Sequence, residues 1–148
     1  MRAMAAPADV YPAHLAAQAE GSCLLLVAEV GGRVVGTGLL RWAPRDAVVA
    51  GRWPGMPEIS NLQVHPDERG SGHGTALVED ACTRASAAGH ACIGIGVGLD
   101  NPDAARLYLR LGFLDTGLAY ADAYSYTDAD GVERDAVDDV RYLVRRLD

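Results

Sequence analysis

Apolar residues along the chain change their spacing several times, and the changes predict the order of the elements. Leucine and valine dominate residues 23–30 and 33–42, which predicts two strands, and the Gly-Gly pair between them is a two-residue hairpin signal. Residues 58–65 form a third predicted strand. It ends at Pro66, because proline has no backbone N–H for a sheet hydrogen bond.

Helical spacing occurs twice in the middle of the chain. Between residues 72 and 88 apolar side chains recur every three or four positions, which predicts a helix that Gly89 closes. Asn101-Pro102 combines an N-cap with a proline at the first helical position, so a second helix is predicted from there to Gly112. The other predicted segments are a short helix over 9–20, a loop over 43–57 and strands over 91–97, 113–126 and 137–147.

This order of elements predicts a mixed α/β fold in a single domain that spans residues 1–148. Right-handed crossovers through the two main helices make the strands that they join parallel. Glycines at 94, 96 and 98 alternate along one predicted strand, which predicts that another group lies close to its backbone.

Composition narrows the range of partners. The formal net charge is −7, and all 13 basic residues are arginine, which argues against a nucleic-acid partner. No apolar run is long enough to span a membrane, and the N-terminus has no signal-peptide pattern. The three cysteines lack metal-ligand spacing, so we expect free thiols, no metal and a cytoplasmic protein.

The segment after the third strand carries the strongest chemical signal. Gly70, Gly72 and Gly74 lie where a strand runs into a helix, and Arg69 stands directly before them. Such a turn exposes the unpaired N–H groups of a helix start, which attract phosphate. Nucleotide-binding folds share this pattern, but the Lys-Ser/Thr ending of a P-loop is absent. A tight structural turn is the remaining alternative.

Two motifs resemble the signatures of the GNAT acyltransferase superfamily. Residues 69–74, Arg-Gly-Ser-Gly-His-Gly, resemble its Arg/Gln-x-x-Gly-x-Gly/Ala motif, and Val64-x-Pro66 precedes them as in that family. Residues 101–113 resemble the second signature, an Asn before a helix that carries Ala-x-x-Leu-Tyr and ends in Leu-Gly-Phe. Two signatures at this separation are far more specific than either one alone.

The resemblance implies a GNAT-like fold. Its central sheet is mostly antiparallel, with a splayed pair of parallel strands and helices on its flanks. The resemblance also implies acetyl-CoA as the donor and direct transfer to an amine. The backbone of the glycine turn would hold the pyrophosphate, and the third strand would hold the pantetheine arm. The residues expected to contact the donor are Leu62, Val64, Arg69, Gly70, Ser71, Gly72, His73, Gly74, Thr75, Asn101, Ala104 and Tyr108.

Tyr108 and Glu58 are the candidate catalytic residues. The Tyr108 phenol would protonate the departing CoA thiolate, and Glu58, or a water molecule, would remove a proton from the amine. The alternative for Tyr108 is a core aromatic residue, and the alternative for Glu58 is a solvated strand end. His65 is a weaker candidate for a proton relay, with a plain surface histidine as the alternative.

Further residues bear on the acceptor and the phosphates. Tyr120, Asp122, Tyr124 and Tyr126 alternate along one predicted strand and could form a wall for a cationic amine. Amphipathic strand packing is the alternative. Arg106 and Arg110 share a helix face and could reach phosphates, or could simply be solvated.

The N-terminus is shorter than in the GNAT pattern, because only 22 residues precede Cys23. The family normally places a strand and two helices there, over the acceptor pocket. We therefore expect either an open pocket or a homodimer that completes it. The alternative function is a non-catalytic acyl-CoA-binding sensor or assembly module. A nucleotide-binding domain is a third interpretation, which the missing lysine disfavours.

Overall fold

The structure of this protein is a computed structural model that describes residue 18 and residues 21–147. The helix expected over 9–20 therefore lies outside the described residues, apart from Gln18. The elements in chain order are β1 (Cys23–Val30), β2 (Arg33–Arg41), α2 (Ala47–Arg52), β3 (Glu58–Val64), the 3-10 turn η1 (Pro66–Glu68), α3 (His73–Ala87), β4 (Cys92–Gly98), α4 (Pro102–Arg110), β5 (Leu114–Thr127) and β6 (Glu133–Arg146).

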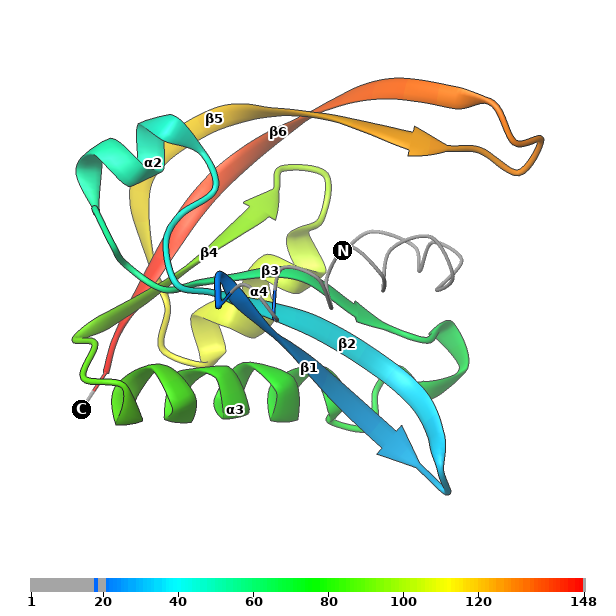
Figure 1. Cartoon of the computed structure of the whole chain (residues 1–148), viewed down its shortest axis with the longest axis horizontal. Helices are drawn as coiled ribbons and strands as arrows, with labels where there is room; N and C mark the ends of the chain where they lie inside the picture. Colours follow the sequence, from blue (N-terminus) through cyan, green and yellow to red (C-terminus); the bar gives the residue numbers. More distant parts are fainter. Residues whose placement is uncertain (1–17, 19–20, 148) are drawn as a thin grey trace.

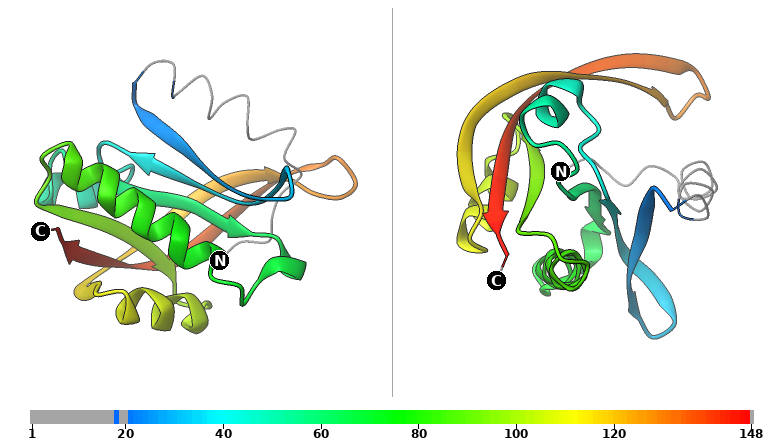
Figure 2. Two further views of the ribbon diagram at one scale, coloured as in Figure 1. Left: turned by 90° about the horizontal axis from the view of Figure 1, so that it is seen from below. Right: turned by 60° about the vertical axis from the view of Figure 1, so that its left-hand side comes forward.

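The six strands within residues 21–147 form one sheet in the order β1-β2-β3-β4-β6-β5. Among these strands β3 and β4 run parallel, and every other neighbouring pair is antiparallel. Helices α3 and α4 lie on one side of the sheet and α2 lies on the other (Figures 1 and 2). The predicted mixed, mostly antiparallel sheet is confirmed.

The parallel pair separates soon after it begins. Pairing between β3 and β4 is limited to Glu58 with Gly94 and Ile59 with Ile95. A bulge follows directly in β3, where the register against β2 shifts and Asn61 adopts a φ of 51°. Because a bulge bends the strand that carries the extra residue, it favours the divergence of β3 from β4. The expected splayed pair is present.

The main core lies between the sheet and helices α3 and α4. The apolar face predicted for α3 is buried there, and Ile59 and Ile95 pack against it from the parallel strands. The buried residues of α3 are Leu77, Val78, Ala81, Cys82 and Ala85.

A smaller cluster covers the other face of the sheet, under α2. Its centre is Tyr142, which is fully buried and stacks on Trp53 at 5.7 Å between ring centroids. A Cβ atom added to Gly94 would stand 2.1 Å from the Tyr142 hydroxyl, and one added to Gly96 would stand 2.8 Å from the Tyr120 hydroxyl. The close neighbours predicted for these glycines are therefore two phenol groups.

Two predicted segments differ from the structure. Residues 43–57 contain the short helix α2, where a loop was expected. Its N-cap is Asp46, whose side chain accepts a hydrogen bond from the Val48 N–H at 2.9 Å. Strand β6 begins at Glu133, four residues before the predicted start at 137. These first residues lie on a hairpin that extends past the body of the protein (Figure 1). Both faces are exposed there, so the sequence has no apolar alternation to mark the start.

Candidate active site

The turn before α3 has the geometry of an anion-binding helix start. Gly70 and Gly72 have φ of 81° and 84°, a left-handed conformation that favours glycine. Gly72 is the N-cap of α3, and none of the described side chains caps the helix. The first N–H groups of this 15-residue helix therefore add their partial positive charge to an open turn.

Gly74 differs from the two glycines before it. Its φ is not positive, and a Cβ atom there would contact Leu107 and Val64 at ordinary distances of 3.8 and 3.9 Å. The chain's own fold therefore leaves room for alanine at this position. The other expected donor contacts of the turn are the exposed Ser71 and the half-buried His73 and Thr75.

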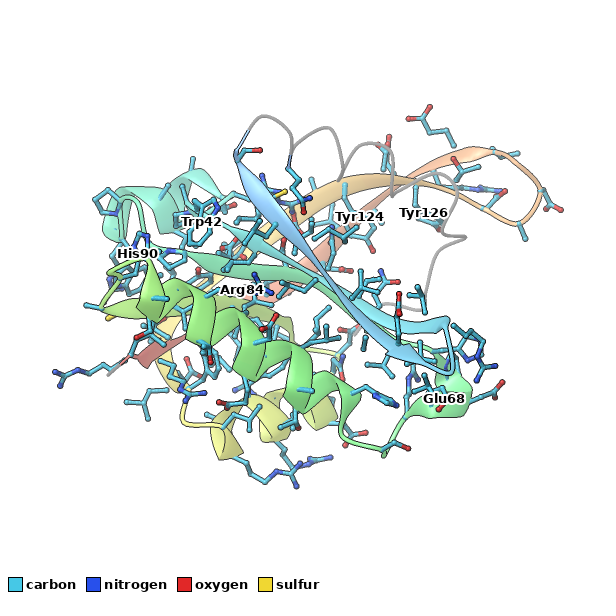
Figure 3. All side chains as sticks on the ribbon, turned by 60° about the horizontal axis from the view of Figure 1, so that its bottom comes forward. Trp42, Glu68, Arg84, His90, Tyr124 and Tyr126 are labelled. Atoms are coloured by element: carbon cyan, nitrogen blue, oxygen red, sulfur yellow. The ribbon has the colours of Figure 1, made fainter. Side chains whose placement is uncertain are left out.

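Charged side chains brace the turn. The Arg69 Nε donates a hydrogen bond to the Val64 carbonyl at 3.3 Å, which holds the turn against the end of β3. Glu68, labelled in Figure 3, forms an ion pair with Arg33 at 2.7 Å and lies 3.9 Å from the His73 Nε2. The Glu68 charge is therefore balanced by a neighbour.

Glu58 lies in the interior, at the head of β3, so the alternative of a solvated strand end is wrong. Its side chain is 5% exposed. The Tyr142 hydroxyl donates to Oε1 at 2.9 Å, and the Arg45 backbone N–H donates to Oε2 at 3.2 Å. Burial raises the pKa of Glu58 above its ordinary value, against the opposing effect of both donors and of the Arg41 and Arg45 charges. A carboxylate with a raised pKa is a stronger base.

Tyr108 lies on the opposite face of the sheet from Glu58. It packs in the main core, 4% exposed, with its ring 6.2 Å from that of Phe113. Burial raises the pKa of Tyr108 to about 12, so the phenol keeps its proton at neutral pH. A substrate in contact with both residues would have to pass between the strands where the pairing of β3 and β4 ends.

Leu62, Val64, Asn101 and Ala104 contribute to the fold around this opening. The side chains of Leu62 and Val64 are buried in the main core. The Asn101 Oδ1 accepts a hydrogen bond from the Ala104 N–H at 3.2 Å and so caps α4. The Asn101 side chain therefore has a structural partner already.

The wall predicted on β5 faces the same side as Glu58. Its residues alternate, with Tyr120, Asp122 and Tyr124 half-buried on one face. Tyr124 and Tyr126 lie side by side along the projecting hairpin, their ring centroids 6.2 Å apart (Figure 3). Asp122 forms an ion pair with Arg45 and lies opposite Asp138 of β6 in the sheet register.

Two of the three weaker candidates have local partners. The His65 Nδ1 accepts a hydrogen bond from the Asp67 N–H at 3.2 Å, which caps the turn η1. Arg106 forms an ion pair with Asp103, and Arg110 is exposed at the end of α4.

Sequence reasoning missed several residues of this site. Tyr142 and the Arg45 backbone donate hydrogen bonds to Glu58 from positions 84 and 13 residues away. The Ser60 Oγ, on the same strand as Glu58, is buried and has no hydrogen-bond partner among the described residues. The alternating glycines of β4 were the one available signal, because they indicate bulky neighbours. They do not say which residues those neighbours are.

Residues 21–147 contain no group of three or more histidine, cysteine or acidic side chains able to hold a metal ion. None of the described helices has the length and apolar character needed to cross a membrane.

The strand order, the splayed parallel pair and the glycine turn together define the fold of an acyltransferase. The acetyltransferase (GNAT) family model matches residues 3–113, and the chain belongs to this family. Over 58 residues the chain is 43% identical to an uncharacterized N-acetyltransferase of Methanocaldococcus jannaschii. That match spans 39% of this chain and 26% of the relative.

Solved structures agree on the fold. The structure of yncA from Salmonella typhimurium with its cofactor acetyl-CoA has a TM-score of 0.66 at 24% identity, covering 97% of this chain and 75% of that one. A GNAT family acetyltransferase from Elizabethkingia anophelis with acetyl-CoA bound has a TM-score of 0.64 at 21% identity, covering 99% and 94%. An N-acetyltransferase from Staphylococcus aureus has a TM-score of 0.68 at 18% identity, covering 95% and 77%. The expected fold is confirmed.

The cap at Asn101 gives a test of its structural role. We predict that Asn101→Ala lowers the free energy of unfolding by about 1 kcal/mol, because the Ala104 N–H loses its partner. Asn101→Asp should retain most of the stability, since aspartate caps equally well. Urea denaturation measures both. If Asn101→Ala and the wild type have the same free energy of unfolding, the cap contributes little to stability. Ligand binding would then be the role left for Asn101.

Proposed function

We propose that this protein transfers an acetyl group from acetyl-CoA to an amine by direct attack. The observation that carries the proposal is the buried Glu58 carboxylate at the point where β3 and β4 separate. A buried base beside an opening in the sheet is the arrangement that an amine acceptor requires, because ammonium must lose a proton before nitrogen can attack.

The donor would be held by backbone groups. The N–H groups at the start of α3 would bind the pyrophosphate, with Arg69 beside them as a permanent cation. The open space at Gly70 and Gly72 and the room at Gly74 support this assignment. The edge of β3 that leaves β4 would pair with the pantetheine arm, and Ser60 offers a buried hydroxyl there.

Glu58 would begin the reaction by taking one proton from the ammonium group of the acceptor, directly or through water. The free amine would then attack the thioester carbonyl carbon, the C–N bond would form and the C–S bond would break. Tyr108 would give its phenolic proton to the departing thiolate and recover one from the amide nitrogen. The net products are the acetylated amine, CoA thiol and one proton released from Glu58.

The acceptor would be a cationic amine. Asp122 and Asp138 face each other across the β5–β6 pair on the Glu58 side, and Tyr120 and Tyr124 flank them. Carboxylates and phenol faces both attract cations, so a small polyamine, an aminoglycoside or a peptide N-terminus fits this wall.

We further infer a cytoplasmic homodimer. Cys82 and Cys92 are free thiols, as in proteins of a reducing compartment. The β5–β6 hairpin extends past the body of the protein and exposes Val137 at 66% of its surface (Figures 1 and 2). A second copy packed on this hairpin would cover that side chain.

Donor binding gives the first test. Calorimetry should detect micromolar binding of acetyl-CoA and CoA but not of ATP or NAD. Gly72→Val should abolish it, since valine strongly disfavours the left-handed backbone of that position. Gly74→Ala is the matched control and should bind normally. No binding of acetyl-CoA by the wild type would leave the glycine turn with a structural role alone.

Transfer to an amine panel tests the catalytic assignment. Tyr108→Phe should lower kcat by about 100-fold while the Kd for acetyl-CoA stays within about threefold, because only the proton of the phenol is lost. Mass spectrometry of the acetylated amines measures the rate. Tight donor binding by a wild type that acetylates no amine would favour the non-catalytic binding module.

The homodimer is tested by light scattering at micromolar concentration. The wild type should have twice the mass of the chain, and Val137→Glu should shift it to a monomer by placing charge in the covered surface. Val48→Glu, at another exposed valine on α2, should remain a dimer. A monomeric wild type would contradict the proposal.

A further inference from the structure

Tyr142 reaches Glu58 from two strands away. It lies on β6, and β4 separates β6 from β3. The Tyr142 ring therefore crosses the backbone of β4 before its hydroxyl meets the Glu58 Oε1 at 2.9 Å. Glu58 and Gly94 are partners in the parallel pair, so the ring passes over Gly94.

The path of the ring depends on the missing side chain at Gly94. A Cβ atom there would lie 2.1 Å from the Tyr142 hydroxyl and 2.5 Å from the ring, distances that real atoms do not reach. Trp53 stacks on the ring, and Thr116 Oγ1 donates a hydrogen bond to the Tyr142 carbonyl at 2.8 Å. A fully buried phenol is thus fixed in one position, pointing at the carboxylate.

We propose that Tyr142 is a positioning residue for proton transfer, which fixes the orientation of the Glu58 carboxylate through Oε1. The Arg45 backbone N–H holds Oε2 in the same way. Each oxygen keeps a further lone pair, so the carboxylate can still accept a proton from an amine. The role in transfer rests on the function proposed above, whereas the fixing of the carboxylate is a property of the free protein.

Several other groups act on the same carboxylate. Arg41 of β2 is its neighbour in the antiparallel register, and Arg45 precedes α2. Tyr120 of β5 lies near it, with Asp46 and Asp122 around that phenol. Arg41 and Arg45 favour the ionised form of Glu58, and the burial of the site disfavours it. The hydroxyl of Tyr142 also favours the ionised form of Glu58, because it donates a hydrogen bond to a charged acceptor.

Titration of Glu58 in the free protein tests the contact without any substrate. The chain has six glutamates, so carboxyl carbon-13 NMR on glutamate-labelled protein resolves a small set of signals, and Glu58→Gln assigns the one of interest. Tyr142→Phe should raise the pKa of Glu58, because the ionised form loses a donor. Tyr126→Phe, which removes an exposed phenol from the same hairpin, should leave it unchanged. An unchanged pKa in Tyr142→Phe would overturn the proposal.

Kinetics then test the role in transfer. Tyr142→Phe should lower kcat/KM roughly tenfold at neutral pH and move the acidic limb of its pH profile upward, with the KM for acetyl-CoA unaffected. In the Glu58→Gln background the same change should have almost no effect, because the residue it positions is gone. Equal losses in both backgrounds would contradict positioning. Inactivity of the wild type would contradict the proposed function and leave the NMR result standing.

Gly94→Ala gives a second route to the same contact, should Tyr142→Phe fold poorly. The added methyl group displaces the Tyr142 hydroxyl without removing it, so the pKa of Glu58 should again rise. Gly51→Ala, where nothing lies within 4 Å, is the control for a glycine substitution. A normal Glu58 titration in Gly94→Ala with a displaced Tyr142 would count against the proposal.

Discussion

The burial of one carboxylate is the constraint on which the site depends. A carboxylate inside a protein must be hydrogen-bonded, because an unpaired buried charge costs several kcal/mol. Glu58 obtains its donors from Tyr142 and from the Arg45 backbone. The first donor requires the open backbone of Gly94, and the second requires the segment that leads into α2. A single buried group thus links β3, β4, β6 and the α2 segment.

The sheet also separates the two halves of the proposed reaction. The glycine turn and Tyr108 belong to the side covered by α3 and α4, while Glu58 and the β5 wall belong to the other. Pairing of β3 with β4 ends after two residue pairs, and the bulge at Asn61 follows at once. A thioester in that opening would contact Tyr108, the proposed acid, on one side of the sheet. The amine would reach it from the other side.

Local signals predicted most of the fold and only part of the site. The strand of residues 23–30 and the turn before α3 depend on neighbouring residues, so periodicity and glycine spacing were sufficient. Helix α2 was not predicted because it lies in a segment rich in proline and glycine. The start of β6 was not predicted because the residues there are exposed. The contact of Tyr142 with Glu58 joins residues 84 positions apart, and no single-sequence pattern encodes such a pair.

The most direct measurement of the central claim follows the acetyl group itself. Acetyl-CoA labelled with carbon-13 in the acetyl group would be incubated with a cationic amine and either the wild type or Glu58→Gln, at several pH values. The account predicts labelled amide from the wild type, with a rate that rises with pH as Glu58 loses its proton, and a far lower rate from Glu58→Gln near neutral pH. Equal rates from the two proteins at every pH would contradict the assignment of Glu58 as the base.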